Sequence, residues 1–69
     1  MLGAKEILRR LLAAGFKIAK QRGSHVKLWH PVTKRRTSVS FHAGRDIGRG
    51  LLAEIIKQAG LTVEEFLKL

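Results

Sequence analysis

The sequence predicts an α+β domain in which two helices pack on one face of a three-stranded antiparallel sheet. Three observations support this fold class: an apolar stripe at helical spacing near the N-terminus, three short alternating segments separated by turns, and a second apolar stripe before a capped C-terminal segment. The predicted order is helix, three strands, helix and short helix, within a single domain over residues 1–69. Helices on one face leave the other face of the sheet open.

Two segments carry the helical stripes. The first is 4–14, whose apolar side chains fall on one face and are Ile7, Leu8, Leu11 and Leu12. Gly15 follows, where a left-handed residue commonly ends a helix. The second is 51–59, whose apolar face consists of Leu51, Leu52, Ile55, Ile56 and Ala59. After it, Thr62 and Glu65 have the spacing of a capping box, which predicts a last short helix.

The strands are predicted over 16–22, 25–30 and 37–41, the first two joined by a turn at 23–24. If that turn has only these two residues, the cross-strand pairs are Arg22 with His25, Lys20 with Lys27, and Ile18 with Trp29. One face of the hairpin then carries Ile18, Lys20, Arg22, His25, Lys27 and Trp29. The other face carries Ala19, Gln21, Val26 and Leu28, and is expected to meet the helices. A bulge would shift the phase of one strand.

The charge of the chain is concentrated in its first half. Residues 1–36 hold ten Lys and Arg and one acid, whereas the four cations and four acids of residues 37–69 cancel, so the net +9 lies in the first half. This asymmetry indicates a polyanion partner, and its place on the strands favours nucleic acid over a membrane. A basic solvated face without a partner is the alternative. Without cysteine, a signal peptide or a long apolar run, the sequence favours a cytoplasmic protein. A monomer is expected, although no particular feature of the sequence indicates the oligomeric state.

His25 is the candidate for chemistry, because an imidazole exchanges protons near neutrality. We expect it to act as general base or general acid in RNA cleavage, the alternative being a hydrogen-bonded strand histidine without a chemical role. The cations expected beside it are Lys20, Arg22 and Lys27. They would stabilise a phosphate transition state, or bind the RNA backbone without a catalytic effect.

Further RNA contacts are predicted around this hairpin. Trp29 is a candidate for base stacking, although a lone tryptophan is more often part of a core. The basic turn is expected to contact nucleic acid and comprises Lys34, Arg35 and Arg36. Ser24 is a further RNA contact, and His42 is the candidate for a second acid or base. The scattered acids predict no metal cluster, so no metal or other cofactor is expected.

Over nearly its whole length the chain resembles the HicA (YcfA-like) toxin family. The resemblance rests on these segments: Gly15-Phe16, Gln21-Arg22-Gly23-Ser24-His25, His42, Gly50-Leu51-Leu52, Ile55-Ile56-Lys57-Gln58-Ala59-Gly60 and Leu61-Thr62-Val63-Glu64-Glu65-Phe66. Two positions depart from the family pattern. Many relatives have Thr where this chain has Leu51, and the lack of that Thr would leave Gly50 as a poorer helix cap. Many also have Pro where this chain has Ser40.

The resemblance implies a double-stranded-RNA-binding-domain-like fold and a metal-independent ribonuclease that cleaves mRNA, with His25 as the catalytic histidine. It also implies a cognate HicB-type antitoxin that blocks the toxin. The alternative function is a non-catalytic RNA-binding module of the same fold, which would use the charge but would not need His25.

Overall fold

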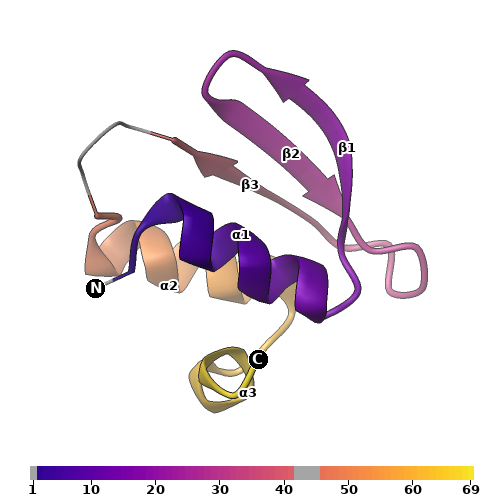
Figure 1. The fold of residues 1–69 in the computed structure, drawn as a ribbon. Coiled ribbons are helices and arrows are strands. Elements are labelled where there is room, and N and C mark those ends of the chain that lie inside the picture. The colour runs from indigo at the N-terminus through magenta and orange to yellow at the C-terminus, as the bar shows by residue number, and fades with distance from the viewer. Residues whose placement is uncertain (1, 42–45) are drawn as a thin grey trace.

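A computed structural model describes residues 2–41 and 46–69 and confirms the predicted α+β fold. The elements in chain order are α1 (Ala4–Ala13), β1 (Lys17–Arg22), β2 (His25–Trp29), β3 (Arg36–Ser40), α2 (Arg49–Ala59) and α3 (Val63–Leu67). The strands form one antiparallel sheet in the order β1-β2-β3, and α1 and α2 lie on the same side of it (Figure 1). This arrangement is that of a double-stranded-RNA-binding-domain-like fold.

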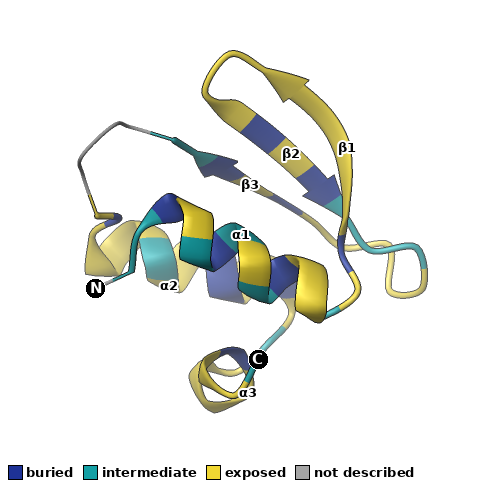
Figure 2. Cartoon of the chain, in the orientation of Figure 1, coloured by how far each residue is buried: buried dark blue, intermediate teal, exposed yellow. Residues whose placement is uncertain are grey.

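The core lies between the helices and the inner face of β2 and β3. Burial alternates along both strands, so that Val26, Leu28 and Val39 are buried while their neighbours in sequence face outward (Figure 2). They pack with Ile7, Leu11 and Ile55, and with the other members of one apolar cluster. All six residues of β1 are exposed. The helices therefore cover β2 and β3 but do not cover β1, contrary to the expectation for Ala19 and Gln21.

The hairpin between β1 and β2 has the predicted two-residue turn and one bulge. Gly23 has φ +57°, as the first central residue of a type II′ turn requires, and Arg22 pairs with His25. The register then shifts between Ile18 and Lys20, leaving Ala19 as an extra residue.

Because of this bulge, the predicted pairing of Ile18 with Trp29 is wrong. Ile18 pairs with Leu28, and Lys17 takes the place opposite Trp29. The bulge thus puts a lysine beside the tryptophan instead of an isoleucine.

Helix α2 begins two residues earlier than predicted. Its N-cap is Gly48, so Gly50 lies inside the helix and the absence of Thr at position 51 removes no cap. Leu51 was expected on the apolar face, but 52% of its surface is exposed. The earlier start places Leu51 in the first turn, on the side of the helix away from the core. At the other end, Gly60 closes the helix with φ +75°.

The C-terminal helix α3 is held by a predicted cap and by an arginine of α1. Thr62 and Glu65 form the capping box. The Arg10 guanidinium donates to the Phe66 carbonyl at 3.1 Å and to the Leu67 carbonyl at 2.8 Å, and its Nε donates to Glu6. Arg10 therefore stabilises the packing of α1 against α3 and is not free to bind RNA. No helix in the described ranges is long and apolar enough to cross a membrane.

Candidate active site

The uncovered face of the sheet carries three rows of side chains set by strand register. Across β1, β2 and β3, the paired residues of these rows are Arg22, His25 and Ser40; then Lys20, Lys27 and Ser38; then Lys17, Trp29 and Arg36. Five of these nine residues are cations and none is acidic. The same alternation that buries the core of β2 and β3 therefore produces a strongly basic open face.

His25 lies in a small pocket at the turn end of this face. The pocket has a volume of about 180 Å³ and is lined by Lys20, Arg22, His25 and Lys27. The structure thus brings the predicted histidine together with all three predicted cations. Backbone pairing explains this convergence, because Arg22 lies opposite His25 and Lys20 lies opposite Lys27. A pocket of this kind attracts an anion the size of a phosphate to the edge of an imidazole.

A serine of β3 orients the His25 ring. Ser40 lies directly opposite His25 in the sheet, and its Oγ is 3.0 Å from His25 Nδ1. Among the described residues no hydrogen bond engages Nε2. A hydroxyl both donates and accepts, so Ser40 can pair with either neutral tautomer and with the imidazolium.

His30, on the following turn, has a structural environment instead. Its Nδ1 accepts from the backbone N–H groups of Val32 and Thr33, so its Nε2 carries the proton and donates to the Ala14 carbonyl at 3.1 Å. Its ring also packs edge-on against Phe16, with 5.2 Å between the centroids. His30 thus joins the turn at 31–35 to the end of α1.

The basic turn divides its side chains between two sides of the molecule. Lys34, whose φ is +65°, holds its ammonium 5.3 Å from the centre of the Trp29 ring, and Arg36 pairs with Trp29 on the open face. The Arg35 side chain lies against Gly60, at the end of α2. Two of the three predicted cations of this turn therefore belong to the same face as His25.

Two predicted site residues, Ser24 and His42, remain. Ser24 is exposed in the hairpin turn and does not line the His25 pocket; its carbonyl accepts from the Phe41 N–H at 2.7 Å. His42 lies outside the described residues. Within residues 2–41 and 46–69, no three His, Asp or Glu side chains are grouped as a metal site would require.

Residues 4–61 match the model of a protein family described as HicA toxin of bacterial toxin-antitoxin. The chain belongs to the HicA toxin family. Its members are toxins of bacterial toxin–antitoxin systems, so membership implies a cognate antitoxin as partner. No curated protein matches the chain. The family match ends before α3, so the Arg10 contacts with Phe66 and Leu67 reach residues beyond the matched range.

Two residues of the candidate site are not indicated by the sequence. Ser40 was noted only as a departure from the family pattern, yet its hydroxyl contacts the His25 ring. Lys17 was overlooked because a regular strand would have put Ile18 opposite Trp29. The pairing of β2 with β3 would have identified Ser40, but the turn at 31–35 has no two-residue signature that fixes the register.

Proposed function

We propose that this HicA-family toxin is a metal-independent endoribonuclease that cleaves mRNA, with His25 as its acid–base catalyst. The observation that carries the proposal is the pocket in which one exposed imidazole is surrounded by Lys20, Arg22 and Lys27 and is oriented by Ser40. His30 differs from His25, because hydrogen bonds engage both of its ring nitrogens. Family membership adds independent support, since it makes the chain a toxin.

The proposed reaction uses the 2′-hydroxyl of the RNA as nucleophile. Its oxygen attacks the adjacent phosphorus, the P–O5′ bond breaks, and the products are a 2′,3′-cyclic phosphate and a 5′-hydroxyl. His25 either takes the proton from the 2′-hydroxyl or gives one to the departing O5′, and water completes the other transfer. One positioned histidine typically contributes about 10²- to 10⁴-fold to such a rate.

The cations are proposed to stabilise the charge that grows on phosphorus. The pentavalent transition state carries more negative charge on its equatorial oxygens than the substrate does, so fixed ammonium and guanidinium groups favour it selectively. Arg22 and Lys27 are closest to His25 in the sheet, as cross-strand partner and as same-face neighbour. Trp29, Lys34 and Arg36 are proposed to bind RNA farther along the face, with Ser24 and Arg35 as ancillary contacts.

A denaturing gel tests this proposal directly. Purified protein and its His25→Ala variant are incubated with end-labelled mRNA in EDTA, and the products are checked for a cyclic phosphate end. Cleavage by the native protein alone is the expected result. Lys5→Ala, which removes an exposed cation of α1 on the other side of the sheet, is the matched control and should cleave normally.

The competing function, a non-catalytic RNA-binding module, has a different outcome in the same samples. In that case neither protein would cut the RNA, while both would shift it on a native gel. Cleavage that persists in His25→Ala would instead leave the nuclease in place and refute the role of His25.

We further propose that the antitoxin is of the HicB type and inhibits by covering the open face. An acidic surface, or a segment that buries His25, would complement the six cations there, which are the five on the strands and Lys34. Binding should then weaken as salt is raised. An affinity that is equal at low and high salt would argue against the electrostatic part of this proposal.

A further inference from the structure

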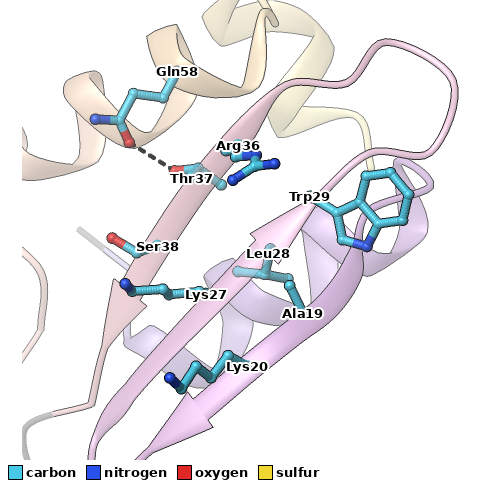
Figure 3. A pocket seen from close by; sticks show the side chains of 9 residues that line it. All are labelled: Ala19, Lys20, Lys27, Leu28, Trp29, Arg36, Thr37, Ser38 and Gln58. Atoms are coloured by element: carbon cyan, nitrogen blue, oxygen red, sulfur yellow. Dashed lines mark hydrogen bonds between the residues drawn. The ribbon is translucent and has the colours of Figure 1, made fainter.

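A second and larger hollow lies beside the His25 pocket on the protein surface. It has a volume of about 710 Å³. Its lining side chains, which Figure 3 shows, are Ala19, Lys20, Lys27, Leu28, Trp29, Arg36, Thr37, Ser38 and Gln58. Lys20 and Lys27 line both hollows, so the two lie next to each other. Along β2 the path runs from His25 through Lys27 to Trp29. The site is therefore longer than a single phosphate requires.

The far end of this groove is aromatic and cationic. Trp29 is half-buried and is not among the buried core residues, and the cations that surround it are Lys17, Lys34 and Arg36. An indole ring offers a stacking surface to any nucleobase, and neighbouring cations bind the phosphates on either side of that base. This combination is typical of proteins that bind single strands.

The spacing along β2 sets the length of RNA that fits. Alternate residues of a strand are about 7 Å apart, so Trp29 lies about 13 Å from His25 with Lys27 midway. An extended nucleic-acid strand has successive phosphates at a similar spacing. A phosphate at His25, the next one between Lys20 and Lys27, and a base on Trp29 are therefore compatible with one continuous strand.

From this geometry we infer that the groove binds unpaired RNA and holds one base on Trp29, at a fixed offset from the phosphate in the His25 pocket. The identity of that phosphate as the cleaved one rests on the proposed function. Bases in a duplex are paired and stacked, so none is free to lie on an indole ring. The protein thus selects single-stranded segments, although its fold is that of a domain class that reads duplex RNA by shape.

Fluorescence tests the base site without any cleavage, because Trp29 is the single tryptophan of the chain. The full-length His25→Ala protein is titrated with a short oligouridylate, with an abasic strand of equal length, and with a short RNA duplex. Stacking on Trp29 should quench its emission with oligouridylate only. Unchanged emission at saturating oligouridylate, or equal quenching by the duplex, would overturn the inference.

Substitution of Trp29 provides the second arm. Trp29→Leu should weaken binding of labelled oligouridylate by about 5- to 150-fold while leaving the affinity for the abasic strand unchanged. Trp29→Phe keeps an aromatic surface and should restore most of the loss. Circular dichroism of both variants verifies that the fold is retained, and an equal loss for both strands would mean that Trp29 does not hold a base.

An abasic scan then measures the offset. A single abasic residue is moved along a cleavable strand, and the cleavage rate of the native protein should fall sharply at one position, about two nucleotides from the cut. A flat profile would refute the fixed offset. Should His25→Ala cleave normally, the proposed role of His25 fails, and should the native protein not cleave at all, the proposed nuclease fails. In either case quenching by oligouridylate would still establish the base site.

Discussion

Replacing Ser40 by Ala isolates the contribution of ring orientation to the proposed catalysis. The change removes the hydroxyl that lies 3.0 Å from His25 Nδ1 and retains the strand, the pocket and the charge around it. The imidazole then rotates more freely, and a smaller fraction of molecules presents Nε2 to the phosphate. We expect the cleavage rate at saturating RNA to fall while RNA affinity stays the same, since a neutral group is lost.

The size of the effect follows from one hydrogen bond between neutral groups. Such a bond contributes about 0.5–1.5 kcal/mol, and each 1.36 kcal/mol is a factor of ten in rate, so the loss should be about two- to tenfold. The bond is exposed to solvent, which favours the lower part of this range. Loss of His25 itself should cost about 10²- to 10⁴-fold, so the two variants are easily distinguished.

Single-turnover cleavage measures the rate, and the ¹⁵N shifts of the His25 ring nitrogens measure the hydrogen bond. Ser40→Ala should move the Nδ1 resonance, and Ser40→Thr, which keeps a hydroxyl, should restore both the shift and the rate. A rate equal to that of the native protein would refute the orienting role. A loss as large as that of His25→Ala would show that Ser40 takes part in the chemistry itself.

Three further predictions concern charge, acid stability and the end of α2. Six cations on the open face, five on the strands and Lys34, predict that the logarithm of RNA affinity falls with the logarithm of salt at a slope of about −4.2. Lys27→Ala should reduce that slope by about 0.7, and an equal reduction in Lys5→Ala, which removes an exposed cation of α1 on the other side of the sheet, would contradict this placement. The hydrogen bond from Arg9, helped by Arg10, lowers the pKa of Glu6 to about 2 from a usual value near 4.5. Because this pKa is depressed in the folded state, the stabilisation that ionised Glu6 gives the fold is complete above pH 4.5 and is lost as the pH falls towards 2. Over this range the melting temperature should therefore fall less in Glu6→Gln than in the native protein. Parallel curves of melting temperature against pH for the two proteins would exclude the effect. Gly60→Ala should lower the free energy of unfolding, measured by urea denaturation, by more than about 1 kcal/mol, because the φ of +75° disfavours Ala and the added methyl would overlap the Arg35 side chain. The cost of Gly60→Ala should be smaller in a protein that also carries Arg35→Ala. Strict additivity of the two substitutions would mean that this overlap has no energetic effect.

The fold could be predicted from the sequence because its local signals agree with one another. Helix α1 ends near Gly15, the hairpin turns at Gly23, and Thr62 and Glu65 cap α3, each as the local pattern indicates. The start of α2 could not be predicted in this way. Gly48 caps it without a side-chain hydrogen bond, so no Ser, Thr, Asp or Asn marks the boundary.

The candidate site was predictable where a tight turn fixes the register and unpredictable elsewhere. The Gly23-Ser24 turn determines which residues face His25 and Lys27 across the hairpin, so the three pocket cations follow from spacing alone. Ser40 depends on the pairing of β3 through a longer turn. The Trp29 groove depends on a bulge at Ala19, which leaves no composition signal in a strand that is exposed along its whole length.

The position of that bulge is consistent with the function proposed for the open face. A shift of one residue moves every side chain beyond it to the opposite face, so a bulge between the turn and Lys20 would have turned Lys20 away from His25. The bulge lies instead between Ile18 and Lys20, where it brings Lys17 beside Trp29 and leaves Ile18 opposite Leu28. The pocket keeps its three cations, and Lys17 joins Lys34 and Arg36 beside the aromatic ring. Since β1 contributes little to the core, this irregularity costs little packing and makes the basic face continuous from His25 to Trp29.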